Sequence, residues 1–327
     1  MKTVSVIMTC HNEEAFIEQA VRSVAVQTAQ ESIREIIVVD DGSTDGSGAV
    51  LARLGGEIGK LRVMEANGIG PSAARNLAIR LASGCFIAFL DGDDYWVREK
   101  LERQLPAFDL DDRIGLVYGD YADFARDDAS DAQAIGVRRL RSASRDTLGA
   151  YFVHDGPVVP STMIVRRAAL DEAGLFDESL HLGEDMDLCL RLAEGWKFEH
   201  VSGVLAFKRR HGSNLTRRLD VFLPVAAALT EKFVARNPRL ASLAGRRMAR
   251  RYAKTGNDCV SQGERWKGLV MLLIAVRRDP FFWRPYVYLA LALVPRGLDG
   301  LIRRRAKAFF HRRTPSMKPI SSRLSGS

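Results

Sequence analysis

Strand-like and helix-like segments alternate over residues 3–90 of this 327-residue chain. Short apolar runs predict buried strands, and the segments between them repeat their apolar residues with a helical period. This alternation predicts an α/β fold with a mostly parallel central sheet flanked by helices. The expected strands are residues 3–9, 33–39, 61–64 and 85–90, and the expected helices are residues 13–26, 45–54 and 71–81.

Polar clusters follow three of the predicted strands. Thr9 ends the first strand and Asn12 comes soon after it, Asp40 and Asp41 follow the second, and Asp91-Gly92-Asp93 follows the fourth. Ligands of such sheets bind at the carboxyl ends of the strands, near the point where the strand order reverses. We therefore expect these side chains to meet at one edge of the sheet and to form one site.

The spacing of Asp91-Gly92-Asp93 suits a divalent cation. Carboxylates two residues apart on an extended backbone point to the same side, and two such oxygens suit a Mg²⁺ or Mn²⁺ ion that also holds substrate phosphates. The alternative is a solvated turn in which Asp94 caps a helix that begins near Tyr95.

Residues 40–46 match the first half of a calcium-binding loop. Ala52 stands where that loop requires a bidentate Glu, so calcium is excluded. What remains is a strand-to-helix turn that directs an acidic residue at a nucleobase or ribose, or a simple capped turn.

Three later segments carry further candidate residues. The Gly-rich residues 68–76 open a helix whose amides and Arg75 suit a phosphate. Asp185 lies in the first turn of another predicted helix, either as a general base or as a complement to the helix dipole. His211 is either a metal or phosphate contact in a closing segment or an ordinary surface residue.

Taken jointly and in this order, these motifs resemble those of the family 2 glycosyltransferases of the GT-A fold. The resemblance extends from Val4 to about Thr216. The matching segments are Val4–Thr9 with Asn12, Glu35–Asp45, Ala74–Asn76, Phe89–Asp94, Pro160–Thr162, Gly174–Glu178, Glu184–Leu188 with Arg191, and Arg210-His211.

The resemblance implies a GT-A nucleotide-diphospho-sugar transferase fold and inverting sugar transfer. The donor would be a nucleotide-diphosphate sugar and the acceptor a saccharide or lipid-linked hydroxyl, in cell-surface polysaccharide or glycolipid synthesis. Asp185 would be the catalytic base, and Asp91, Asp93 and His211 would hold a divalent metal, Mn²⁺ or Mg²⁺. The residues expected to bind the nucleotide-sugar are Thr9, Asn12, Asp40, Asp41, Arg75, Asp91 and His211.

Two residues depart from the family pattern. Thr9 stands where the family often has Pro, and His11 stands where it often has Tyr. Without the Tyr, the sequence does not indicate which nucleotide base is bound.

Other functions are less well supported by the residues. A nucleotidyltransferase would carry a Gly-rich loop with Arg and Lys directly after the first strand, whereas residues 11–14 are acidic there. A non-catalytic nucleotide-sugar-binding protein would not need both Asp93 and Asp185. A membrane-docked scaffold would leave the acidic clusters without a role.

The C-terminal part of the chain is Arg-rich and helical in pattern. From residue 277 onward there are 12 Lys and Arg against 2 Asp, whereas residues 1–276 carry a net charge of −2. Basic and aromatic residues alternate over residues 302–313, after the apolar stretch 281–294. This region is either a helix packed on the catalytic domain or an interfacial segment on an anionic membrane. No motif for nucleic-acid binding is present.

We therefore expect a catalytic domain over residues 1–216, a helical Arg-rich region over 217–313 and a disordered tail over 314–327. Residues 127–145 are expected to be a long surface loop that affects acceptor choice. The four cysteines form no CxxC pair, which favours a reduced compartment. No apolar stretch near the C-terminus approaches the ~20 residues that span a bilayer. The expected location is the cytoplasm, with peripheral association at the cytoplasmic face of the membrane.

Overall fold

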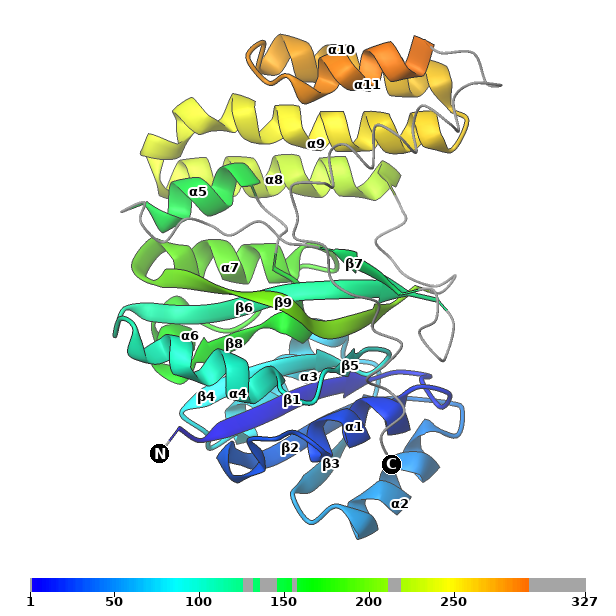
Figure 1. Ribbon diagram of the computed structural model, residues 1–327, viewed down its shortest axis with the longest axis vertical. Coiled ribbons are helices and arrows are strands. Elements are labelled where there is room, and N and C mark those ends of the chain that lie inside the picture. The colour runs from blue at the N-terminus through cyan, green and yellow to red at the C-terminus, as the bar shows by residue number, and fades with distance from the viewer. Residues whose placement is uncertain (1, 126–131, 136–145, 155–157, 211–218, 294–327) are drawn as a thin grey trace. The chain divides into compact units, whose positions relative to one another are not determined.

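The computed structural model describes residues 2–125, 132–135, 146–154, 158–210 and 219–293, which form the helices and strands of Figure 1. The chain divides into two compact units, residues 1–214 and residues 215–327. The domain boundary expected at residue 216 lies outside the described residues, as do His211, residues 302–313 and the tail from residue 314.

Four parallel strands form the N-terminal half of the sheet in the first unit, in the order β3-β2-β1-β4. These strands and the helices between them confirm the alternation that the sequence predicted. The strands are β1 (Val4–Cys10), β2 (Ile33–Asp41), β3 (Leu61–Ala66) and β4 (Phe86–Asp91), and the helices are α1 (Ile17–Ala25), α2 (Ser47–Glu57) and α3 (Pro71–Leu81).

Both faces of this half-sheet are covered by helices. Val6 and Met8 of β1 pack with Val21 of α1 and Leu51 of α2 in one hydrophobic core. Helix α3 packs against β1 and β2, and right-handed crossovers place it on the face opposite α1 and α2. The strand order reverses between β1 and β4, so the carboxyl ends of these two strands mark the expected binding edge.

The other half of the sheet is mixed rather than parallel. β4 is followed by β8, β6, β9 and β5, and of these neighbours only β6 and β9 pair in parallel. The strands are β5 (Tyr95–Trp96), β6 (Ile114–Phe124), β7 (Gln133–Ile135), β8 (Ile164–Arg166) and β9 (Lys197–Arg209), and the helices are α4 (Lys100–Gln104), α5 (Thr147–His154), α6 (Arg167–Ala173) and α7 (Glu184–Gly195).

Two local expectations are wrong. The helix placed near Tyr95 is instead the strand β5, because the Tyr95 ring stacks on Phe207 of β9 with 4.7 Å between ring centroids. Of the loop expected over residues 127–145 only residues 132–135 are described, and these include β7, which pairs with residues 121–123 of β6. In both places pairing with a distant strand decides the structure, and no local period signals it.

The second unit is helical, as the sequence predicted. Its described helices are α8 (Leu219–Arg236), α9 (Ala241–Ser261), α10 (Arg265–Arg278) and α11 (Arg284–Leu293). α9 and α10 approach closely because Gly256 and Gly268 face each other, and a Cβ on Gly268 would lie 2.7 Å from the Gly256 carbonyl oxygen. None of the described helices combines the length and apolar character needed to cross a membrane.

Candidate active site

The register of the parallel strands brings the predicted polar clusters together. Thr9 at the end of β1 lies opposite Val39 of β2 on one side and opposite Asp91 of β4 on the other. Cys10 lies opposite Asp40. The ends of three strands therefore meet at one edge of the sheet, as expected.

The carboxylates of Asp40 and Asp41 hold the loops that follow neighbouring strands. Both oxygens of Asp41 accept hydrogen bonds, one from the Ile69 amide and one from the Gly70 amide, at 2.7 Å each. Asp40 accepts a 3.2 Å hydrogen bond from the Ser43 amide. Both side chains are buried, so these two residues shape the floor of the site and fix the Gly-rich segment before α3.

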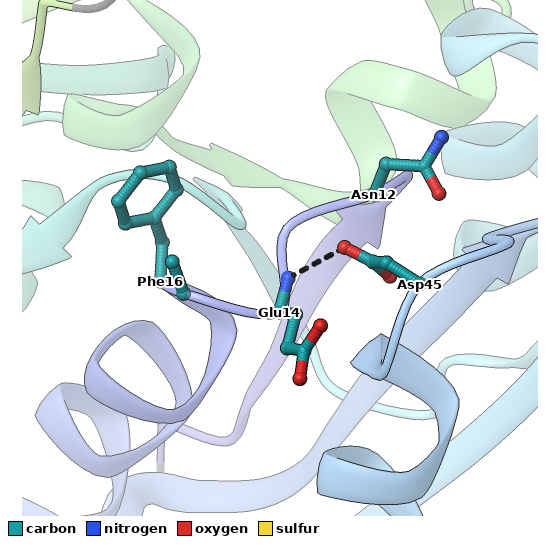
Figure 2. Close-up of a pocket in the computed structure, with 5 residues that line it drawn as sticks. Asn12, Glu14, Phe16 and Asp45 are labelled. Carbon is teal, nitrogen blue, oxygen red and sulfur yellow. Dashed lines mark hydrogen bonds between the residues drawn. The ribbon is translucent and has the colours of Figure 1, made fainter.

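Asn12 joins the loop after β1 to the loop after β2. Its backbone is left-handed, with φ of 57°, and its Oδ1 accepts a 2.7 Å hydrogen bond from the Thr44 amide. A pocket of about 510 Å³ opens beside it, and Figure 2 shows the lining residues Asn12, Glu14, Phe16 and Asp45. Within the pocket wall, the Glu14 amide donates a 3.1 Å hydrogen bond to Asp45.

Arg75 connects two of the predicted acidic motifs. Its guanidinium donates to Asp91 at 2.8 Å and to Glu184 at 3.1 Å, and it lies 5.5 Å from the centroid of the Phe176 ring. The side chain is only 9% exposed. Arg75 thus brings the end of β4 next to the start of α7, where Asp185 lies.

The backbone of Asp91-Gly92-Asp93 is a turn, closed by a 3.1 Å hydrogen bond from the Asp94 amide to the Asp91 carbonyl. The expected extended backbone is therefore wrong. Asp94 accepts hydrogen bonds from the Ser161 hydroxyl at 2.6 Å and from the Arg209 amide at 2.9 Å. These two hydrogen bonds hold the turn in place. Burial and the neighbouring Asp93 raise the pKa of Asp94 well above its ordinary value.

Glu13 also belongs to this cluster, and the sequence did not single it out. A Cβ atom on Gly92 would lie 1.9 Å from Oε2 of Glu13, so the Glu13 carboxyl occupies the space that only a glycine leaves open. This oxygen is buried and has no hydrogen-bond partner among the described residues. Burial, followed by the charges of Asp93 and Asp91, raises the pKa of Glu13 to about 9, so the group is neutral at pH 7.

Lys208, near the end of β9, is a second residue that sequence reasoning missed. It lies opposite Asp123 in the pairing of β6 with β9. Burial alone would lower the pKa of its ammonium group, but Asp94 and Asp91 outweigh that effect and raise it. Lys208 is therefore a permanent positive charge beside the carboxylates.

Asp185 is the second residue of α7, which begins at Glu184 directly after Gly183, whose φ of 82° favours glycine. Burial and the adjacent Glu184 raise the pKa of Asp185 to about 6, against a 2.7 Å hydrogen bond that the Met186 amide donates to it. The helix start is held by the 2.8 Å ion pair of Asp187 with Arg191. A carboxylate with such a pKa is suited to accepting a proton near neutral pH.

The remaining family motifs connect elements around the site. Asn76 of α3 donates to the Phe176 carbonyl at 2.9 Å and accepts from the Phe176 amide at 2.9 Å. Arg191 donates to the carbonyl oxygens of Ala173 and Leu175 at 2.7 Å each. These residues hold the segment between α6 and α7, and thereby the position of Asp185.

Predicted metal ligands are only partly placed by the structure. Asp91 and Asp93 lie in the same turn, whereas His211 falls outside the described residues. Over the described part of the chain, no group of three His, Cys, Asp or Glu side chains could hold a metal ion.

A parallel half-sheet joined to a mixed half, with carboxylates at the strand ends, defines the GT-A class of sugar-nucleotide transferases. The family described as "Glycosyl transferase family 2" matches residues 5–174. The chain belongs to that family.

Curated proteins are similar to part of this chain. The succinoglycan biosynthesis protein ExoU of Rhizobium meliloti is 33% identical over 219 residues, which cover 61% of this chain and 61% of that protein. The Escherichia coli protein WfgD, described as a UDP-Glc:alpha-D-GlcNAc-diphosphoundecaprenol beta-1,3-glucosyltransferase, is 39% identical over 118 residues, covering 36% and 45%. The chain spans between about half and three fifths of the length of such relatives.

Solved structures share the fold. TarS of S. aureus, residues 1–349 in complex with UDP-GlcNAc, superposes with a TM-score of 0.61 at 22% sequence identity. The similarity covers 96% of this chain and 90% of the TarS chain. The aligned part of TarS therefore includes residues that match the C-terminal helices of this chain.

Proposed function

We propose that this protein is an inverting glycosyltransferase that moves a sugar from a nucleotide-diphosphate sugar to an acceptor hydroxyl. One observation carries the proposal. Arg75 joins Asp91, at the end of β4, to Glu184, the neighbour of Asp185, by hydrogen bonds of 2.8 and 3.1 Å. The diphosphate-binding turn and the base of such a reaction are thereby neighbours.

A UDP-sugar is the donor that the relatives favour. TarS has been solved with UDP-GlcNAc, and WfgD is described as using UDP-Glc. In this chain we assign the nucleoside to the edge formed by Thr9, Asn12 and Asp41. Because Asp40 and Asp41 already bond the surrounding loops, they would shape this pocket, and backbone groups would make much of the contact.

Asp185 acts as the general base in this proposal. Its ionised carboxylate accepts the proton of the acceptor hydroxyl as that oxygen attacks the sugar from the face opposite the diphosphate. One base is sufficient for inversion, since no covalent sugar–enzyme intermediate is formed. The cations Arg75 and Lys208 lie beside the carboxylates at the same edge, where negative charge develops on the leaving group.

A divalent cation, Mn²⁺ or Mg²⁺, is proposed at the Asp91-Gly92-Asp93 turn, with His211 as a further contact. The turn offers two carboxylates, whose hard oxygen atoms suit such an ion, and the diphosphate of the substrate would supply further oxygen ligands. The ion would contribute positive charge to the departing diphosphate.

We propose a saccharide or lipid-linked acceptor and a peripheral location at the cytoplasmic face of the membrane. Two relatives support this. ExoU is described as a succinoglycan biosynthesis protein, and the name of WfgD specifies an undecaprenol-linked acceptor. The basic C-terminal part of the chain agrees with a location at an anionic surface.

Thermal stabilisation and product release test the proposal together. UDP-GlcNAc, UDP-Glc and GDP-mannose are added with Mn²⁺, and the melting temperature and the release of nucleoside diphosphate are measured. A transferase gives stabilisation by one nucleotide-sugar, and Asp185→Asn keeps that stabilisation while losing turnover. A non-catalytic binder would be stabilised by a donor, but the wild type would release no more nucleoside diphosphate than Asp185→Asn does. Stabilisation by none of the donors would contradict the proposal.

A further inference from the structure

An apolar stripe runs along the exposed side of α10. Trp266, Val270 and Leu273 are 79%, 39% and 58% exposed. Their spacing of four and three residues places them on one side of the helix. The buried side of α10 consists of other residues, Gly268, Leu272 and Ala275.

Further aromatic side chains are exposed beyond the end of α10. Phe281, Trp283 and Tyr286 are 95%, 51% and 46% exposed. Phe282 between them turns inward and packs with the buried alanines of α9 and α10. We call the six exposed residues, Trp266, Val270, Leu273, Phe281, Trp283 and Tyr286, the aromatic face.

The folding of the second unit does not account for the aromatic face. The small cores that α9, α10 and α11 form consist of inward-facing residues such as Ala249, Phe282 and Leu272. A surface helix normally has a polar outer side, and large exposed apolar patches mark contacts with a partner or a membrane.

The charge around the aromatic face identifies the partner. Arg265 and Lys267 flank Trp266, Arg277 and Arg278 end α10, and the Arg284 guanidinium lies 5.8 Å from the Trp283 ring centroid. Residues 215–327 contain 24 Lys and Arg against 6 Asp and Glu, whereas residues 1–214 contain 24 against 34. The net charge therefore favours contact of an anionic surface with the second unit rather than with the first.

We propose that the aromatic face is a docking surface for an anionic phospholipid bilayer. The aromatic rings would lie at the depth of the lipid headgroups, and the flanking Arg and Lys would pair with lipid phosphates. This proposal specifies which surface of the chain would bind the membrane, and it rests on the peripheral membrane location proposed above. It does not require that the protein transfers a sugar. The contact surface lies on α10 and the start of α11, and residues 302–313, which contain six of the basic residues counted above, would add to its attraction to the bilayer.

Vesicle sedimentation tests the docking surface with the full chain. We expect the protein to sediment with vesicles of equal parts phosphatidylglycerol and phosphatidylcholine, and to remain in solution with phosphatidylcholine alone. Raising salt should release it, since the Debye length falls from ~10 Å at 0.1 M to ~3 Å at 1 M.

The double variant Trp266→Gln with Leu273→Gln tests whether the aromatic face, rather than another part of the chain, binds the vesicles. It should lower vesicle partitioning roughly tenfold or more, because partitioning scales with buried apolar area. The matched control Leu110→Gln changes an equally apolar residue of the first unit that is 72% exposed, and should bind as the wild type does. Unchanged binding of the double variant overturns the proposal.

Two further readouts distinguish the other outcomes. Sedimentation velocity without lipid shows whether the double variant dissociates an oligomer, which would mean that a second copy covers the face and would also overturn the proposal. Stabilisation by a nucleotide-sugar with Mn²⁺ should be the same in all variants. Its absence in the wild type would contradict the transferase function and leave the vesicle result to be judged separately.

Discussion

At the scale of single residues, the site consists of carboxyl groups whose environments differ. Glu13 is neutral at pH 7, with a pKa raised to about 9, whereas Asp185 has a pKa of about 6. Asp91 is paired with Arg75. Separating the pKa values of nearby carboxyl groups allows one of them to act as a base while another carries a proton.

The pKa of Asp185 predicts an acidic limb in the pH dependence of transfer. The base acts in its ionised form, which is populated above pH 6, so kcat/KM should fall about tenfold per pH unit below that value and be constant above it. Asp185→Asn should lower kcat by ~10²–10⁴-fold and remove the limb. The exposed control Asp171→Asn should keep both the rate and the limb, and a limb that persists in Asp185→Asn would place the base elsewhere.

Glu13 predicts a pH-dependent gain in stability on substitution. Its pKa is raised from 4.5 to about 9 on folding, so the folded state keeps a proton that the unfolded chain releases between these values. Removing that penalty in Glu13→Gln should stabilise the protein by roughly 3 kcal/mol at pH 7. The gain should vanish below pH 4.5 and grow toward pH 9.

Urea unfolding at several pH values measures this gain. Glu65→Gln, at an exposed position, provides the control and should show no comparable pH dependence. A Glu13→Gln protein that is less stable than the wild type at pH 7 would mean that the carboxyl is ionised and bonded in the folded chain.

Sequence reasoning found the residues that belong to motifs and missed those that belong only to the fold. Arg75, Asp91 and Asp185 could be predicted, because Asp91 ends a strand and the other two lie in the first turns of helices, each within a recognisable motif. Glu13 could not, because its burial depends on Gly92, which comes much later in the chain. Lys208 belongs to no motif, and the pairing of β5 with β9, which sets Tyr95 opposite Phe207, brings it near Asp94.

At the scale of secondary-structure elements, the turn after β4 and the segment before α1 form one packed unit. The Glu13 carboxyl fills the space beside Gly92, while Ser161 and Arg209 hold Asp94 from the other elements. The geometry of the acidic turn is thus set by contacts from β1, the residues before β8, and β9.

A double-mutant cycle tests this contact. Gly92→Ala should destabilise the protein by about 1–3 kcal/mol and weaken UDP binding, because its methyl group would overlap Glu13. Adding Glu13→Ala removes the overlapping carboxyl and should restore part of both losses, with a coupling energy of roughly 0.5–3 kcal/mol. Additive effects in urea unfolding and calorimetric UDP titration would show that the two residues do not touch.

Elements with a strong local period were predicted well, and those that depend on distant pairing were not. Pro71 opens α3, and the helix covers the expected residues 71–81. β2 extends to Asp41, two residues beyond its apolar run, because Asp40 and Asp41 still pair with β1 and β3. β5 and β7 contain two and three residues, too few for any period, and exist through β9 and β6.

At the scale of the whole molecule, the two units have opposite charge. The first unit has ten more acidic than basic residues, and the second has eighteen more basic than acidic ones. This division could be predicted from the sequence, since charge counts need no structure. The aromatic face could not, because only the helix packing shows which apolar residues of α10 remain exposed.

The two units should respond to different ligands in a calorimetric unfolding scan. In the proposed function UDP with Mn²⁺ binds the first unit, and at about 100 times its dissociation constant a ligand adds ~2.7 kcal/mol to the stability of the unit that binds it. For a unit of roughly 200 residues, each kcal/mol raises the melting temperature by about 2–4 °C. We therefore expect UDP to shift one transition upward and phosphatidylglycerol vesicles to shift only the other. Asp93→Ala should remove the UDP shift and keep the vesicle shift, because it changes a carboxylate of the first unit alone. A single transition that moves as a whole with either ligand would show instead that the two units unfold together.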